Sequence, residues 1–381
     1  MKLPIDLKAV IEVATDIESA RSTPVSVSVL IDDSAPGDVA AHIRSAFVGA
    51  GAHARVTVGY FAGPAFSPYE GDDMAVIVAG FSEEVGRRAA EIRAAGVPVM
   101  VVTSMPSLVA DMASAYGNPI PEGDLVAPEG VVACEADGDA ACASGEVAGA
   151  HVSVFTGIRA KGSADSAAGS AGSSDDLDAP IPIDDAAAAA LDRRMGEWVV
   201  AACREKRLAL ALSFPFVRRP LSLEAVSATS LQNAGIGLVL FIPGADMPLM
   251  TLNQAKMLLQ IAAAYGEPMS AARVKELAAI VAGGFACRSV ARQVAGVVPG
   301  VGWAVKAGVG YAGTKAMGLA AVEYFERGGN IAGLAGVVSS ATAKATQIAG
   351  DVAATPAGAR VLSTVKTAVR QGAASVLKKT E

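Results

Sequence analysis

Two neighbouring carboxylates, Asp32 and Asp33, directly follow an apolar segment that has the alternation of a β-strand. Two hydroxyls, those of Thr103 and Ser104, directly follow a later apolar run over residues 97–102. If both runs are parallel strands of one sheet, their carboxyl ends lie at the edge where open α/β sheets bind ligands. Carboxylates and hydroxyls at such an edge can hold Mg²⁺ and a phosphoryl group. Asp32, Asp33 and Thr103 are therefore the candidate ligand-binding residues of the N-terminal half.

A phospho-receiver would use this edge, but it needs two further groups that the sequence lacks. The acceptor Asp of a receiver ends the third strand, and here the third apolar run continues into Ala79-Gly80-Phe81. A receiver also has a Lys after the fourth strand, and no Lys follows Thr103 before Lys161. A turn or a helix cap is thus the favoured role of the acidic pair. A ligand-sensing or nucleotide-sensing edge, without phosphorylation, is kept as the alternative.

A phosphate-binding loop is missing after the first predicted strand. Such a loop needs the pattern G-x-x-x-x-G-K-[ST], in which backbone N–H groups and one Lys surround the phosphates. The turn over residues 32–38 has instead three carboxylates and no Lys, so it repels phosphate. The G-x-G-x-x-G match at residues 308–313 follows a predicted helix, and 40 glycines make such a match expected by chance. We expect no nucleotide hydrolysis and no cofactor.

Other catalytic and metal-binding patterns are also missing from the sequence. The four cysteines have unrelated spacings and the histidines number only three, so no Zn site is expected. None of His42, His53 and His151 has an evident Ser or Cys partner, and there is no G-x-S-x-G nucleophile elbow. We therefore predict no catalytic residues and no metal, and we expect a protein that is not an enzyme.

The elements that position the candidate edge alternate between strand and helix over residues 24–104. Strands are predicted at residues 25–31, 55–60, 74–79 and 97–102, with helices after Pro36 and at 82–95. The last two strands are continuous apolar runs, as in strands that are covered on both faces. This order predicts an α/β fold: a doubly wound parallel sheet, flavodoxin-like or Rossmann-like but without a phosphate loop.

Composition divides the chain into five parts. Residues 1–22 are predicted to form an amphipathic helix, residues 23–134 the α/β domain, and residues 135–180 a flexible linker. A Gly/Ala-rich, all-α domain follows over residues 181–327, and a basic helical tail over 328–381. The first helix of the all-α domain should begin at Asp184 or Asp185. Further helices are predicted at residues 221–241, 250–265, 270–295 and 303–326 and over much of 331–379.

Charge is divided unevenly between the two halves of the chain. Residues 1–180 carry 25 acidic and 10 basic side chains, and residues 181–381 carry 13 and 21. The resulting net charges of −15 and +8 add to the −7 of the whole chain. This division indicates that the C-terminal half meets an anionic surface. Because aromatic residues rarely alternate with the basic ones, nucleic acid is not expected, and membrane lipid is the favoured partner.

Small residues recur at every fourth position through the predicted 303–326 helix. The series is Gly300, Ala304, Gly308, Ala312, Ala316 and Ala320. Small residues at this spacing let a second helix approach closely, either in a tightly packed soluble bundle or in a membrane-embedded interface. No stretch of this half is both uncharged and strongly apolar over the roughly 20 residues of a plain membrane span. A peripheral or hairpin-inserted attachment is therefore expected.

Several motifs in the all-α domain resemble those of a known family. One segment contains Pro243, Gly244, Asp246, Asn253, Gln254, Tyr265 and Gly266, and a later one contains Pro299, Gly302 and Trp303. Together they are similar to the YcjF-like, GTPase-associated domain of unknown function (DUF six-nine-seven) family of bacteria. The similarity extends over residues 190–327.

The resemblance implies an intracellular bacterial protein, often membrane-associated, whose relatives frequently carry a Ras-like GTPase domain before this region. It implies no catalytic residues. This chain departs from those relatives, because its α/β domain lacks the phosphate loop and has Thr103-Ser-Met-Pro106 where a GTPase has Asn-Lys-x-Asp. A GTPase is then a candidate for the unknown protein partner rather than a part of this chain.

These observations favour a non-enzymatic protein on the cytoplasmic side of the inner membrane, whose acidic α/β domain recruits or senses a partner. Two alternatives stay open: a ligand-sensing or degenerate GTPase-like module built on the sheet, and a soluble helical scaffold without lipid contact. The small-residue helices need other surfaces to cover them, so self-association into a homo-oligomer is a further expectation.

Overall fold

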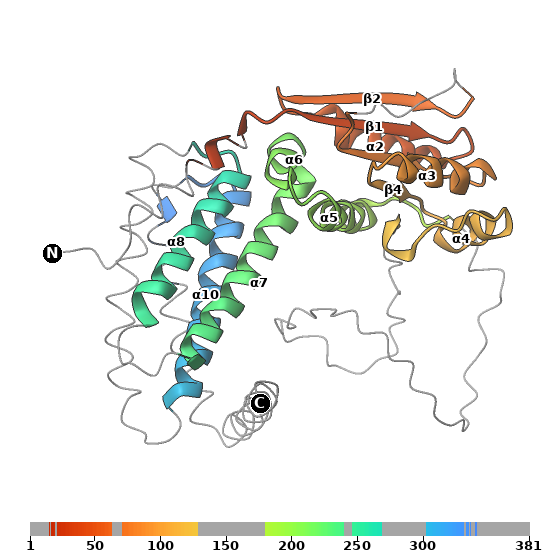
Figure 1. Ribbon diagram of the computed structural model, residues 1–381. Coiled ribbons are helices and arrows are strands. Elements are labelled where there is room, and N and C mark those ends of the chain that lie inside the picture. The colour runs from red at the N-terminus through yellow and green to blue at the C-terminus, as the bar shows by residue number, and fades with distance from the viewer. Residues whose placement is uncertain are drawn as a thin grey trace, which may run out of the picture.

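The computed structural model describes residues 21–62, 71–128, 180–239, 246–268 and 302–330, and in addition residues 15, 17–19, 333, 334, 336 and 340. These residues form a parallel sheet with helices on both faces and, beside it, a group of long helices (Figure 1). The predicted linker up to residue 179, the predicted helix at 270–295 and most of the basic tail lie outside the described residues.

Five parallel strands form the sheet, in the order β2-β1-β3-β4-β5. Their bounds are β1 Val25–Ile31, β2 Ala54–Tyr60, β3 Met74–Val78, β4 Val99–Val102 and β5 Leu125–Val126. The predicted α/β fold with an all-parallel sheet is confirmed, and each predicted strand lies within two residues of its expected ends. The sequence did not predict β5, because two residues are too few to show a periodic pattern.

Helices cover both faces of the sheet. On one face α2 (Gly37–Val48) and α5 (Asp185–Ala202) pack against alternate strand residues such as Val27 and Val76. On the other face α3 (Glu84–Ala94) and α4 (Pro106–Ala115) pack against the intervening residues, among them Ile77. Every residue of β3 and β4 is buried as a result, which explains their continuous apolar sequences.

α5 belongs to the core of the sheet although it follows the predicted linker. Its N-cap is Asp184, one of the two residues predicted to start the helix, and the Asp184 carboxylate accepts a hydrogen bond of 2.7 Å from the Ala187 N–H. Leu191 and Met195 of α5 are fully buried in the same core as the strands. The sequence assigned this helix to the all-α domain, so the packing of the α/β part continues past the boundary that was predicted at residue 181.

Three long helices lie side by side next to the sheet: α7 (Pro215–Val239), α8 (Asp246–Ala264) and α10 (Gly302–Glu326) (Figure 1). The short α6 (Arg207–Ser213) leads into α7. α7 begins earlier than predicted, and Pro215 occupies its first position, where a missing N–H costs little. No helix in the described part of the chain has the length and apolarity needed to cross a membrane.

Aromatic side chains join the two parts of the structure. The ring centroid of Phe47 in α2 lies 4.9 Å from that of Phe214 and 5.4 Å from that of Phe216, at the start of α7. Phe214 is fully buried, and one hydrophobic core extends from the sheet through α5 to α7. Such continuous apolar burial resembles the interior of one domain more than a contact between two separate domains.

Basic residues of the C-terminal half also contact the sheet. The Lys206 ammonium lies 2.7 Å from the Asp73 carboxylate, and the Arg194 guanidinium donates a hydrogen bond of 2.7 Å to the Ala127 carbonyl. From the net positive charge of residues 181–381, the sequence predicted that the basic side chains of this half meet an anionic membrane surface. These two side chains instead hold the helical part against the acidic part of the chain.

Candidate functional site

Asp32 lies at the carboxyl edge of the sheet, meaning the edge at which the strands end. It follows β1, at the point where the strand order reverses direction between β1 and β3, which is where open α/β sheets bind ligands. Its side chain is 3 % exposed. One carboxylate oxygen accepts hydrogen bonds from the Gly80 N–H at 2.9 Å, the Ser82 N–H at 3.3 Å and the Ser34 hydroxyl at 2.8 Å. The other accepts from the Ser34 N–H at 3.1 Å.

These bonds hold the loop after β1 directly against the loop after β3. A Cβ at Gly80 would lie 2.3 Å from the backbone carbon of Ser34, so the two backbones touch where only glycine fits. The Phe81 N–H donates to the Ser34 hydroxyl at 3.0 Å and closes the contact. Since four donors already surround the Asp32 carboxylate, this residue stabilises two loops and leaves little capacity to coordinate a ligand.

The side chains of the other two candidate residues at this edge also accept hydrogen bonds from backbone N–H groups. The Asp33 carboxylate accepts a hydrogen bond of 2.7 Å from the Ala62 N–H. The buried Thr103 hydroxyl accepts a hydrogen bond of 3.0 Å from the Met105 N–H, in a turn that leads into α4. Within the described residues, no hydrogen bond joins Thr103 to Asp32 or Asp33. The sequence placed all three residues at the correct edge, but each of their side chains accepts hydrogen bonds from a different backbone segment.

The segment just before α5 crosses the same edge. The Ile181 N–H donates to the Ser104 carbonyl at 2.9 Å, and the Ile183 N–H donates to the Asp38 carboxylate at 3.1 Å. The chain therefore runs from the end of β4 to the start of α2 across the strand ends. No group of three or more His, Cys, Asp or Glu side chains that could hold a metal occurs in the part of the chain that the structure describes.

Side chains with shifted pKa values lie away from this edge. The Asp192 carboxylate of α5 accepts a hydrogen bond of 2.8 Å from the His42 ring in α2, and this bond raises the pKa of His42. Burial raises the pKa of the Cys203 thiol to about 12, so this cysteine stays protonated and is a poor nucleophile. Burial likewise raises the pKa of the Tyr265 hydroxyl above its usual range. The His42 shift thus comes from its bond to Asp192, whereas burial is the main cause of the other two.

The family-like motif residues Asn253 and Gln254 belong to a buried polar network between α7, α8 and α10. The Asn233 amide donates to the Thr314 hydroxyl at 3.0 Å, and the Gln254 amide donates to the same oxygen at 2.8 Å. The Asn253 amide donates to the Asn233 carbonyl at 3.1 Å. Asn233, Gln254 and Thr314 are at most 1 % exposed. This network connects three helices and fixes their register.

Tyr265 and Gly266 of the same motif end α8. Gly266 has a φ of +88°, and the N–H groups of Gly266 and Glu267 donate back to the carbonyls of Ala263 and Ala262, as in a Schellman motif. The Tyr265 ring stacks on Phe325, with centroids 5.9 Å apart.

Of the other motif residues, Asp246 begins α8, Gly302 and Trp303 begin α10, and Pro243, Gly244 and Pro299 lie outside the described residues. In the described residues the motif thus has structural roles.

The series of small residues lies beside the main contact of α10 rather than at its centre. Gly300 is outside the described residues, Ala304 and Gly308 are in α10, and Ala312, Ala316 and Ala320 are half-buried. α7 comes close at Gly318, where a Cβ would lie 2.4 Å from a methyl carbon of Val226. The sequence missed Gly318 because it does not belong to the four-residue series.

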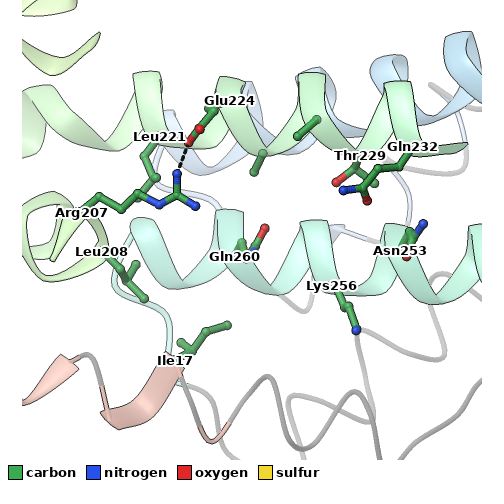
Figure 2. Close-up of a pocket in the computed structure, with 12 residues that line it drawn as sticks. Ile17, Arg207, Leu208, Leu221, Glu224, Thr229, Gln232, Asn253, Lys256 and Gln260 are labelled. Atoms are coloured by element: carbon green, nitrogen blue, oxygen red, sulfur yellow. Dashed lines mark hydrogen bonds and ion pairs between the residues drawn. The ribbon is translucent and has the colours of Figure 1, made fainter. Parts of the chain in front are cut away.

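A groove lies between α7 and α8 and has a volume of about 450 Å³ (Figure 2). Arg207 and Glu224 form an ion pair of 2.6 Å at one end of it. The sequence singled out none of its polar side chains as a site except Asn253, because they come from helices that are distant in the sequence. The lining residues are Ile17, Arg207, Leu208, Leu221, Glu224, Ala225, Ala228, Thr229, Gln232, Asn253, Lys256 and Gln260.

The fold and these sites define an α/β protein whose parallel sheet shares its core with an adjoining group of helices. No match was found among models of protein families, among curated proteins or among solved structures. The functional conclusion therefore depends on the geometry of this chain.

Proposed function

We propose that this is a non-enzymatic, membrane-associated protein whose helical end contacts lipid and whose α/β part recruits a protein partner. The observation that supports lipid contact is a set of exposed apolar side chains at the end of the helices far from the sheet. Leu231 of α7 is 70 % exposed, Leu249 of α8 47 % and Tyr311 of α10 38 %. Leu231, Leu249 and Tyr311 lie within three residues of Asn233, Met250 and Thr314, respectively. Because Asn233 is hydrogen-bonded to both Met250 and Thr314, the three exposed side chains lie at about the same height along the three helices.

The same end of the helices carries few charges. Residues 225–239 of α7 and 247–255 of α8 contain no charged side chain, and residues 302–314 of α10 contain only Lys306. The Lys315 ammonium lies 5.6 Å from the Tyr311 ring centroid, and Lys and Tyr side chains are common where a protein meets the headgroup layer. An uncharged, apolar end bordered by such residues favours shallow insertion without a spanning helix.

Flotation with anionic vesicles tests this proposal. The wild-type chain should float with the vesicles, and the double variant Leu231→Glu/Leu249→Glu should stay at the bottom, because each Glu puts a charge into the acyl layer. Val48→Glu is the matched control, since Val48 is 81 % exposed but lies on α2 beside the sheet. Equal flotation of all three proteins, or no flotation of the wild type, contradicts lipid contact by this end.

The observation that supports partner recruitment is the open edge of β2. The Phe61 N–H donates to the Ile31 carbonyl at 3.0 Å. The backbone N–H and C=O groups of the odd-numbered residues of β2 therefore point towards β1. The N–H and C=O groups of Val56, Val58 and Tyr60 consequently point to the other side, where the described residues contain no further strand.

Val58 and Tyr60 are also about half exposed, at 45 % and 44 %. An extended partner segment could add to such an edge as a sixth strand. The closed carboxyl edge at Asp32 favours this role over ligand sensing. The strand order supports a doubly wound, flavodoxin-like assignment of the sheet. Of the partner classes, a GTPase is the one that the sequence resemblance implies, at the cytoplasmic face of the inner membrane.

Pull-downs with two baits altered at Val58 test recruitment through β2. Val58→Pro removes an outward N–H but is tolerated in an edge strand, and Val58→Thr keeps that N–H. A protein that the wild type retains should be lost with Val58→Pro and kept with Val58→Thr. Retention of the same protein by both variants contradicts strand addition at this edge.

A further inference from the structure

The groove between α7 and α8 has an aliphatic end and a polar end (Figure 2). Leu208, Leu221 and Ile17 line the aliphatic end, where the Arg207–Glu224 ion pair also lies, and the small side chains of Ala225 and Ala228 continue the groove along α7. At the polar end Thr229 and Gln232 of α7 lie across from Asn253 of α8, and the Lys256 side chain extends from α8 away from α7 (Figure 2). The groove includes none of the exposed side chains Leu231, Leu249 and Tyr311 that we assign to lipid contact, although part of its lining belongs to the same uncharged stretches of α7 and α8.

The charges that line the groove do not cancel. Glu224 is its only carboxylate, and Arg207 neutralises it in an ion pair of 2.6 Å. Lys256 is half-buried, and its ammonium has no hydrogen-bond or ion-pair partner among the described residues. The Asn253 amide, held by its bond of 3.1 Å to the Asn233 side-chain oxygen, is neutral and adds no charge to the groove. One positive charge therefore remains at the polar end.

We propose that this groove binds a single-chain anionic amphiphile, with a carboxylate or phosphate head on Lys256 and an alkyl chain towards Leu221. The head would accept hydrogen bonds from the Lys256 ammonium, and the chain would lie on Ala225 and Ala228. From Thr229 back to Leu221 the helix rises about 12 Å, which is about the length of a ten-carbon chain. A volume of about 450 Å³ is in the range of small-molecule sites.

Calorimetry of the full chain with decanoate and with decyl phosphate, below their micelle concentrations, tests the assignment. Both should bind, while decanol and inorganic phosphate, which lack the head charge or the chain, should bind at least about tenfold more weakly. Lys256→Gln should weaken decanoate binding at least about tenfold, and Ala228→Phe should abolish it by filling the groove. Arg87→Gln is the control, because the Arg87 side chain is exposed on α3, away from the groove. This variant should bind decanoate as the wild type does.

Anionic vesicles distinguish a free amphiphile from a lipid in a bilayer. Thermal unfolding followed by circular dichroism should show that Lys256→Gln and Ala228→Phe are folded. A loss of binding heat in calorimetry then reports a loss of binding and not a loss of folded protein. Equal decanoate affinity of the wild type and Lys256→Gln overturns the proposal. So does binding to vesicles alone, with no heat from free decanoate or decyl phosphate, because the groove would then not hold a single chain.

Discussion

Gly196 of α5 lies against the backbone carbonyl of Phe216 in α7: a Cβ at position 196 would be 2.4 Å from that oxygen. Pro220, four residues after Phe216, has no N–H to donate to this carbonyl, so α7 lacks one internal hydrogen bond there. The same Cβ would be 2.7 Å from the Pro220 ring. α5 and α7 thus cross where α5 has a glycine and where the Phe216 carbonyl of α7 lacks its helical N–H partner.

Gly196→Ala should destabilise the protein, because the new methyl group meets backbone atoms that cannot rotate away. We expect a loss of about 1–3 kcal/mol in the free energy of unfolding, measured with urea. Gly235→Ala in α7 is the control, since a Cβ there has open space within 4 Å. That substitution should stabilise by about 0.5–1 kcal/mol through helix propensity alone. A Gly196→Ala protein as stable as the wild type would contradict the close crossing.

Asp32→Asn should reveal the structural role of this carboxylate. The new NH₂ group would face the N–H groups of Gly80, Ser34 or Ser82, so we expect a loss of about 2–4 kcal/mol in urea unfolding. Asp33→Asn should cost less than about 1 kcal/mol, because Asp33 is exposed and accepts one bond. If the two variants are equally stable, Asp32 does not hold the loops together.

Thr314→Val should uncouple the buried network of α7, α8 and α10. Valine has nearly the same shape but removes the oxygen that both Asn233 and Gln254 bond, leaving two buried amides with lost partners. We expect a loss of about 2–4 kcal/mol, measured by thermal and urea unfolding. Thr57→Val, on the outer strand β2, should change stability by less than about 0.5 kcal/mol. A small effect of Thr314→Val would show that other bonds hold the helices in register.

Gly318→Ala should destabilise the α7–α10 contact, and Val226→Ala should partly restore it. The added methyl group would meet the Val226 methyl groups, and shortening Val226 removes the clash. A double-mutant cycle in urea should give a favourable coupling of about 1 kcal/mol or more. Additive effects of the two substitutions would mean that these residues do not touch.

The stabilisation from His42 and Asp192 should depend on pH. Asp192 raises the pKa of His42 above the 6.5 of an unperturbed histidine, so the folded state binds the proton more tightly than the unfolded state. The contribution is fully present below about pH 6.5 and is lost as the pH rises through the raised pKa. The wild type should therefore exceed Asp192→Asn in melting temperature at about pH 6, with the difference shrinking towards about pH 9. A difference that grows with pH contradicts this sign.

The sequence by itself determined the local elements and which side chains occur at their ends. The alternation in residues 25–31, the continuous apolar runs at 74–79 and 97–102, and the cap at Asp184 or Asp185 all depend on neighbours a few residues away. Such patterns can be recognised in the sequence because hydrogen-bonding period and burial repeat within one strand or helix. The position of Asp32 and Thr103 at the carboxyl edge followed from the same reasoning.

Only the tertiary structure decided which of these elements share a core and which polar groups meet. α5 could have packed with the helices that follow it, but its apolar face covers the sheet, and Phe214 extends that core into α7. Asn233, Gln254 and Thr314 meet from three helices, and Gly318 faces Val226 across a distance of 92 positions. The periodicity of a single helix or strand does not predict such pairings, because one apolar face can pack against any of several other faces. The choice among them depends on the shape and hydrogen-bonding needs of the whole chain.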